Sequence, residues 1–84
     1  MPIHTTTPKL TPEQIRILKM LTHRTDPLRQ EEIPAAVGLD RALVDPAVLM
    51  LISYRLIEVD MGTGTLAYRI TPAGRTALED SQKP

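Results

Sequence analysis

The stretch from Ala42 to Ile52 constrains the fold most, because nine of its eleven residues are apolar and the other two are Asp45 and Pro46. A helix that is apolar on nearly all sides is normally buried on nearly all sides. The chain has 84 residues and no cysteine, so it has room for about one domain and no disulfide to support it. The sequence therefore predicts a single domain that is stabilised by packing around this segment.

A first helix is predicted to begin at Thr11. Thr11, Pro12 and Gln14 combine a hydroxyl N-cap, a proline at the first helical position and an amide three residues after the cap, which is the pattern of a capping box. The apolar residues Ile15, Ile17, Leu18 and Leu21 then recur at helical spacing and form one face, and Arg16 and Lys19 point away from it. The helix is predicted to end near His23, and the turn formers of residues 24–27 are predicted to form a loop.

A second and a third helix are predicted to follow, separated by a short turn. The second covers residues 30–37, and Gly38 stands where a left-handed residue ends a helix. Asp40 is placed to cap the third helix, which runs towards Tyr54. The pattern therefore indicates two helices joined by a tight turn.

Proline at position 46 complicates the third helix, because proline has no backbone N–H to donate. In one alternative the helix kinks at Pro46. In the other, Asp45 and Pro46 are the cap and first position of a shorter helix, and residues 40–44 form a separate turn. The sequence leaves both alternatives open.

The segment after the third helix predicts a β-hairpin. Residues 56–61 and 66–70 alternate apolar and polar side chains with the period of a strand. Residues 62–64, Gly-Thr-Gly, supply two positions that tolerate a positive φ, so the strands are expected to close as a tight hairpin. A third short strand near Leu28 is expected to pair with this hairpin.

The two ends of the chain differ from the middle. A second threonine-proline pair, at 71–72, predicts a last helix over residues 73–80. Residues 1–10 have no periodicity and are expected to form a flexible arm, and residues 81–84 a flexible tail. The domain is therefore predicted to span residues 11–80, and its class to be mainly α with a small β-hairpin.

Three motifs carry a resemblance to a known family. They are Val-Gly-Leu-Asp at 37–40, Leu51 four residues before Arg55 and the Leu-Ile pair that follows it, and Tyr-Arg-Ile-Thr-Pro-Ala-Gly-Arg at 68–75. In this order they resemble the winged helix-turn-helix core of MarR-like and PadR-like transcriptional regulators, most specifically through the last run. These families usually carry glycine at the position of Arg55.

The resemblance implies a small transcriptional regulator that reads double-stranded DNA, with the third helix in the major groove and the wing at a neighbouring minor groove or phosphate. The side chains that it implies as contacts are basic, amide or hydroxyl groups near the starts of the second and third helices and on the wing. They are Arg29, Gln30, Arg41, Thr63, Thr65 and Arg69.

The charge and hydropathy of the third helix support an alternative hypothesis. Ten basic and ten acidic residues cancel over the chain, and residues 31–60 carry six acids against Arg41 and Arg55. An apolar third helix also exposes large side chains, which are Leu43, Leu49 or Met50 according to its phase after Pro46. Exposed apolar patches are typical of interfaces. The alternative is thus a winged-helix module for protein–protein interaction or homodimerisation that does not bind DNA.

Several other classes of function lack support in the sequence. His4 and His23 have no ligand spacing that indicates a metal site, and the Gly-Thr-Gly of residues 62–64 is too short for a nucleotide-binding loop. No apolar run reaches the roughly 18 residues of a membrane span, and residues 1–9 lack the apolar core of a signal peptide. The sequence predicts a cytoplasmic protein with no catalytic residues, no metal and no cofactor.

Overall fold

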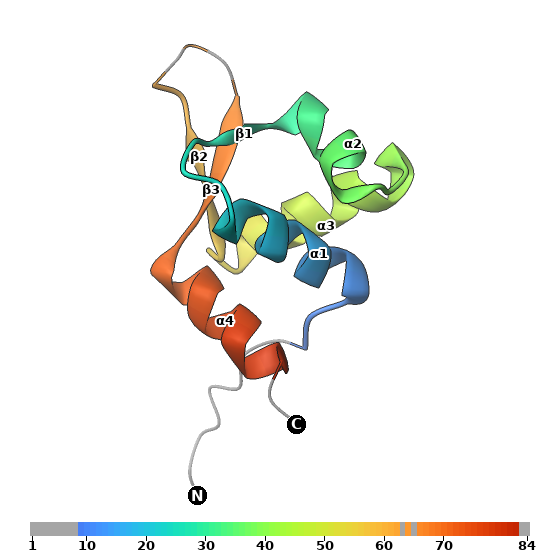
Figure 1. Cartoon of the computed structure of the whole chain (residues 1–84), viewed down its shortest axis with the longest axis vertical. Helices are drawn as coiled ribbons and strands as arrows, with labels where there is room; N and C mark the ends of the chain where they lie inside the picture. The colour runs from blue at the N-terminus through green and yellow to red at the C-terminus, as the bar shows by residue number, and fades with distance from the viewer. Residues whose placement is uncertain (1–8, 63, 65, 83–84) are drawn as a thin grey trace, which may run out of the picture.

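The computed structural model describes residues 9–62, 64 and 66–82. The helices are α1 (Pro12–Thr22), α2 (Ile33–Val37), α3 (Arg41–Ser53) and α4 (Pro72–Gln82), with a 3₁₀ turn, η1 (Gln30–Glu32), before α2. The strands are β1 (Leu28–Arg29), β2 (Ile57–Asp60) and β3 (Ala67–Ile70). Figure 1 shows the small sheet at one end of the helical layer, and α1 contacts all the other helices. The predicted class, mainly α with a small sheet, is confirmed.

Helix α1 begins as the sequence predicts. The backbone N–H of Gln14 donates to Thr11 Oγ1 at 3.2 Å, and the backbone N–H of Thr11 donates to Gln14 Oε1 at 3.0 Å. Both bonds of the capping box are therefore formed, and they satisfy donors that the first helical turn leaves free. The apolar face packs inward, with Ile17, Leu18 and Leu21 buried.

Only the second part of the second predicted helix is an α-helix. The prediction of one helix over residues 30–37 is wrong at its start, because η1 comes first and α2 begins at Ile33. One local and one distant contact hold the tighter turn: the N–H of Arg29 donates to Glu32 Oε1 at 3.2 Å, and the N–H of Gln30 donates to the carbonyl of Leu66 at 3.3 Å. Pro34 lies in the first turn of α2, where its missing N–H has no intrahelical partner to lose.

Helix α3 runs through Pro46 without a break in its assigned residues, so the separate turn over residues 40–44 is excluded. Asp40 is the N-cap in an extended conformation, and its carbonyl accepts from the N–H of Val44 at 3.0 Å. Pro46 has no N–H to donate to the carbonyl of Ala42, four residues earlier. Both residues are exposed, so water can hydrogen-bond to that carbonyl instead. The buried face of α3 consists of Val44, Ala47, Val48 and Leu51.

The sheet is antiparallel throughout, with strand order β1-β3-β2. Tyr68 in the central strand pairs with Leu28 on one side and with Val59 on the other. The predicted third strand near Leu28 is thus confirmed. Its partner lies far along the chain, so this pairing ties the loop after α1 to the wing.

The connection between β2 and β3 is longer than predicted. The prediction of a tight hairpin is wrong, because β2 ends at Asp60 and β3 starts only at Ala67. The N–H of Gly62 donates to Asp60 Oδ1 at 2.8 Å, and the N–H of Gly64 donates to the carbonyl of Met61 at 2.9 Å. These local bonds take the place of further hydrogen bonds between β2 and β3. Gly64 has a φ of +81°, whereas Gly62 does not adopt a positive φ.

The start of α4 is fixed by contacts with the end of α3. Thr71 Oγ1 accepts from the N–H of Gly74 at 3.0 Å and donates to the carbonyl of Arg55 at 2.8 Å. A side chain on Gly74 would place its Cβ 2.0 Å from the carbonyl oxygen of Leu56, so the helix and this backbone touch directly. Glycine at this position is therefore required by the packing.

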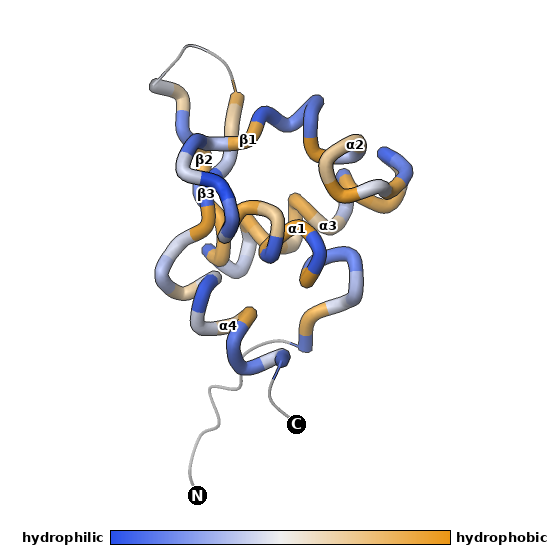
Figure 2. Tube along the Cα trace, viewed as in Figure 1, coloured by the Kyte–Doolittle hydropathy of each residue, from blue (hydrophilic) through white to orange (hydrophobic). Residues whose placement is uncertain are grey.

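The core lies where α1, α3, α4 and the sheet meet, and Figure 2 shows hydrophobic residues gathered there. Leu10, which the sequence places in the terminal arm, is buried against this core. At the other end, α4 continues to Gln82. The outer surface of α3, in contrast with that of α1, remains hydrophobic.

Candidate nucleic-acid interface

The turn between α2 and α3 sets how α3 is presented. Gly38 adopts a φ of +71°, and the N–H groups of Gly38 and Leu39 donate to the carbonyl of Pro34 at 2.9 and 3.1 Å. Leu39 then packs partly against the core. This is a helix-turn-helix, because α2 is followed by a left-handed glycine and α3 begins after the three residues 38–40.

Three of the predicted contact residues come together beside the start of α3. Arg29 at the end of β1, Gln30 in η1 and Arg41 in the first turn of α3 line one shallow depression. Glu31 and Leu66 complete its lining. Residues from three separate parts of the chain are thus placed on one surface, between the base of the wing and the N-terminus of α3.

The side chain of Gln30 is held in place by the wing. Tyr68 donates its hydroxyl to Gln30 Oε1 at 2.9 Å, and the N–H of Gln30 bonds to the carbonyl of Leu66. With its amide oxygen occupied, Gln30 keeps its amide NH₂ as a donor. Burial, followed by the negative charge of Asp45, raises the pKa of Tyr68 above its usual value, so the phenol stays a donor at neutral pH.

The two arginines of the depression differ in whether an acidic side chain lies beside them. Arg29 Nη1 lies 3.4 Å from Glu31 Oε1, and both side chains are largely exposed, so this pair is weak. Arg41 forms no ion pair with any residue in the described part of the chain. Arg41 is therefore the better placed of the two to bind an external anion.

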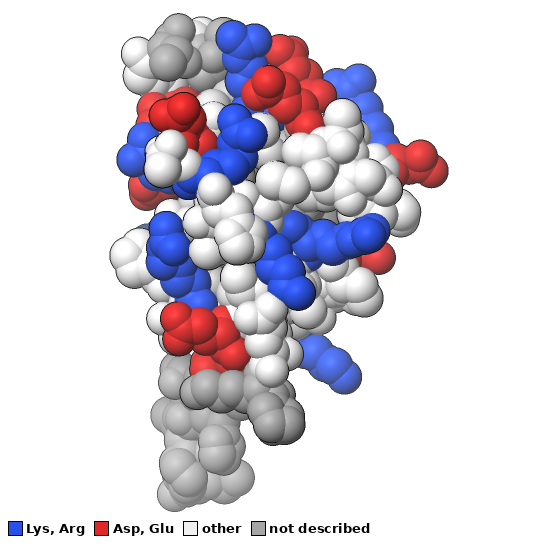
Figure 3. Space-filling model, viewed as in Figure 1, with Lys and Arg blue, Asp and Glu red and all other residues white. Residues whose placement is uncertain are grey.

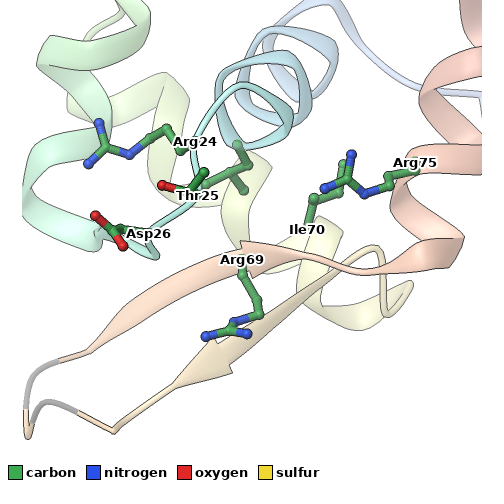
Figure 4. A pocket seen from close by; sticks show the side chains of 7 residues that line it. Arg24, Thr25, Asp26, Arg69, Ile70 and Arg75 are labelled. Atoms are coloured by element: carbon green, nitrogen blue, oxygen red, sulfur yellow. The ribbon is translucent and has the colours of Figure 1, made fainter.

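Arg69 does not join this group. Its guanidinium bonds to the carboxylate of Asp60, diagonally across the β2–β3 ladder. The N–H of Gly62, and next to it Arg69, hold the pKa of Asp60 below its usual range, so the ion pair persists at neutral pH. Figure 4 shows Arg69 pointing away from Arg24 and Arg75, with which it lines a second depression.

Further basic side chains lie on α1 and on the loop that follows it. Arg16, Lys19 and Arg24 are exposed there. Figure 3 shows Lys and Arg side chains spread across the middle of the face on which α1 lies. In a helix-turn-helix, however, it is the second of the two helices, here α3, that is presented to DNA.

The outward surface of α3 is apolar. Leu43, Leu49 and Met50 have exposed fractions of 48%, 65% and 41%. The sequence predicted that one or another of them would be exposed, and in the structure all three are. Ser53, also exposed, uses its hydroxyl to donate to the carbonyl of Leu49 at 3.1 Å. Few side chains of α3 can therefore read base edges, and Arg41 at its start is the basic one.

Thr63 and Thr65 fall outside the described residues, and their proposed contacts stay predictions. The sequence reasoning missed Glu31 and Leu66 as parts of the depression and Tyr68 as the side chain that holds Gln30. No local signal indicates Leu66 and Tyr68, because their proximity to Gln30 depends on the pairing of β1 with β3.

Within the described residues, no group of three or more His, Cys, Asp or Glu side chains is arranged to hold a metal ion. Among these same residues, no helix has the length and hydropathy to cross a bilayer.

Comparisons with known proteins agree on the fold. No protein-family model matches the chain, and a search of curated proteins finds no match either. Among solved structures, a MarR-family transcriptional regulator from Silicibacter pomeroyi superposes with a TM-score of 0.74 at 19% identity, over 86% of this chain and 49% of that one. BpsR of Bordetella bronchiseptica, whose DNA binding is regulated by 6-hydroxynicotinic acid, superposes with a TM-score of 0.76 at 24% identity, over 88% of this chain and 54% of BpsR.

MepR, a transcription regulator of the Staphylococcus aureus multidrug efflux pump MepA, gives a TM-score of 0.72 at 23% identity, over 86% of this chain and 55% of MepR. The chain spans about half the length of these structures. The resemblance found in the sequence is confirmed at the level of the fold. The chain has the winged helix-turn-helix fold of MarR-family transcriptional regulators.

Proposed function

We propose that this chain is a winged-helix DNA-binding protein that regulates transcription in the cytoplasm and contacts duplex DNA through α3 and the wing. One observation carries the proposal: Arg29, Gln30 and Arg41 line a single depression beside the N-terminus of α3. The likeness to regulators of the MarR family supports the same surface, because the helix-turn-helix and wing are the shared parts.

The depression has the chemistry of a phosphate contact. Arginine offers a planar fork of N–H donors that matches phosphate oxygens, and an amide NH₂ adds a neutral donor. Arg41 also lies in the first turn of α3, where the positive end of the helix dipole favours an anion. A backbone phosphate beside the major groove would therefore meet Arg41 first, with Arg29 and Gln30 on its other side.

The proposed contacts position the protein more than they read sequence. Phosphate contacts fix register and orientation, whereas sequence is read at base edges or through DNA shape. The exposed side chains of α3 are mostly apolar, so we assign base contact to Arg41 alone on this helix. Thr63, Thr65 and Arg69 are proposed as secondary contacts of the wing, Arg69 only when it leaves Asp60.

The test is fluorescence anisotropy of a labelled mixed-sequence duplex titrated with the protein at two salt concentrations. Replacement of Arg41 by alanine is expected to weaken binding by about ten-fold or more and to lower the salt slope by about one. Arg29→Ala is expected to have a smaller effect, because Glu31 already offsets part of its charge. The matched control is Arg16→Ala, which removes an exposed arginine from α1.

Equal losses for Arg41→Ala and Arg16→Ala would contradict the proposed site, because they would indicate attraction by overall charge. Absence of binding at low salt would contradict the function itself. In that case the exposed Leu43, Leu49 and Met50 favour the second function, a winged-helix module for protein–protein interaction.

A further inference from the structure

The hydroxyl of Tyr68 joins the wing to the turn before α2. Tyr68 lies in the central strand, β3, where it pairs with Leu28 of β1 and with Val59 of β2. Its side chain is buried, with an exposed fraction of 4%, and its hydroxyl donates to Gln30 Oε1 at 2.9 Å. The two bonded residues are 38 positions apart in the chain. A polar group at the edge of the core thus holds one side chain of the depression beside α3.

The backbone of Gln30 is fixed by the same part of the wing. Its N–H donates to the carbonyl of Leu66, the residue directly before β3, at 3.3 Å. Arg29, the residue before Gln30, pairs with Ala67. Backbone and side chain of Gln30 are therefore both bonded to the wing. An amide that is held in this way has little rotational freedom left to lose when it binds a ligand.

The bond from Tyr68 also determines which atoms the amide of Gln30 offers to a ligand. A free glutamine amide carries an acceptor and two donors, and with both kinds of atom it can bind the edge of adenine. Here Oε1 is turned towards the wing, and among the described residues no hydrogen bond uses Nε2. The group that remains for a ligand is the NH₂, a donor, which suits the oxygen atoms of phosphate.

We infer that Tyr68 is a positioning residue for duplex binding: its hydroxyl turns the Gln30 amide so that the NH₂ donates to a backbone phosphate beside Arg41. Tyr68 itself does not touch DNA, because its side chain is buried. Burial and the charge of Asp45 raise the pKa of Tyr68, so the hydroxyl keeps its proton and donates at neutral pH. The inference rests on the proposed function, since it assigns a role within the same depression.

Two variants of Gln30 separate the bond to Tyr68 from the donor. Gln30→Glu keeps an oxygen that accepts from Tyr68 but replaces the NH₂ by a second carboxylate oxygen, whereas Gln30→Leu removes both. In the anisotropy titration, Gln30→Leu is expected to weaken duplex binding by about ten-fold, and Gln30→Glu by more, because its carboxylate repels phosphate. A smaller loss for Gln30→Glu than for Gln30→Leu would contradict the donor role.

Tyr68→Phe removes the hydroxyl and keeps the ring that fills the core. It is expected to weaken duplex binding by about five-fold, because the freed amide can rotate. In the Gln30→Leu background the same change should have no further effect on binding, because the hydroxyl acts only through the amide. The matched control is Tyr54→Phe. It removes the hydroxyl of an exposed tyrosine at the C-cap of α3 and should leave duplex binding unchanged.

A merely structural role for Tyr68 would give a different result. In that case Tyr68→Phe would lower the free energy of unfolding but leave the duplex affinity of the folded protein unchanged. Urea denaturation and circular dichroism establish that each variant is folded under the conditions of the titration. Nuclear magnetic resonance of ¹⁵N-labelled protein gives a second readout. The side-chain NH₂ signals of Gln30 should shift when duplex is added to the unchanged chain, and should shift less in Tyr68→Phe.

The inference and the proposed function fail in distinguishable ways. Absence of duplex binding by the unchanged chain at low salt overturns both. Binding that is weakened by Arg41→Ala but is the same in Tyr68→Phe overturns the inference alone. The inference is also overturned if the losses from Tyr68→Phe and Gln30→Leu add in the double variant, because the hydroxyl would then act by another route.

Discussion

Helices α1 and α3 have similar lengths, 11 and 13 residues, and both bury one face in the same core, but their outer faces differ. On α1 the outer face carries Arg16 and Lys19, which water solvates. On α3 it carries Leu43, Leu49 and Met50. The inner faces are set by a shared requirement to fill the core, so the outer faces report what each helix meets beyond the domain. For α1 this is solvent, and for α3 we propose DNA.

The largest expected effects come from the inner faces, where the two helices are alike. Leu18→Ala in α1 and Leu51→Ala in α3 should each lower the free energy of unfolding by about 2–5 kcal/mol, because both side chains are fully buried. Leu49→Ala on the outer face should change it by less than about 0.5 kcal/mol. Urea denaturation of dilute samples measures all three. A loss at Leu49 equal to that at Leu51 would show that the outer face is buried within one chain.

The starts of the two helices should differ by a smaller amount. Thr11→Ala is expected to cost about 1 kcal/mol, because both capping-box bonds are present at α1. Asp40→Ala should cost less than Thr11→Ala, because the Asp40 side chain makes no capping hydrogen bond at α3. The same denaturation experiment ranks the pair, and the reverse order would contradict this account of the caps.

Glycine should stabilise the end of α3 but not the end of α1. Arg55 has a φ of +60°, which a side chain disfavours, so Arg55→Gly is expected to stabilise the fold by about 0.5–1 kcal/mol. His23 ends α1 at a φ of −85°, so His23→Gly should give no gain. Thermal melting of dilute samples is the measurement. A destabilised Arg55→Gly variant would show that the Arg55 side chain contributes more than its backbone strain costs.

The smallest expected effect concerns the stability contributed by Tyr68, and it appears only at alkaline pH. Burial and the charge of Asp45 raise the pKa of Tyr68 above the usual value of 10.0, so the folded state favours the neutral phenol. Its contribution to stability is complete below about pH 10 and is lost as the pH rises through the folded pKa. Tyr68→Phe should remove this part of the pH dependence of the free energy of unfolding. An unchanged profile in the variant would contradict the assignment.

Much of the fold follows from local patterns. The Thr11 capping box and the left-handed Gly38 are as the sequence predicts, since each depends on a few neighbouring residues. The strand near Leu28 is also as predicted, although it depends on a distant partner, β3. The predictions that fail lie at the start of the second helix and in the wing connection. There, distant or non-helical bonds compete with the local pattern, such as that from Gln30 to the carbonyl of Leu66.

The candidate site divides in the same way. Arg29, Gln30 and Arg41 were identifiable singly, because their side-chain chemistry is visible in the sequence and their places follow from the resemblance. Their meeting in one depression was not, since it depends on the register in which β1 pairs with β3 and on Tyr68 holding Gln30. Arg69, predicted with them, is bonded to Asp60 instead.

The sequence by itself determined where α1 begins, which face of α1 is apolar and where α2 ends, because caps, glycines and periodicity act over a few residues. Only the tertiary structure decided which apolar face of α3 is covered and which is left outside. Two apolar faces of α3 compete for one core, and the face with Val44 and Leu51 is the one packed into it. Leu43, Leu49 and Met50 are exposed because the described residues form one core, and that core is filled from the other face of α3.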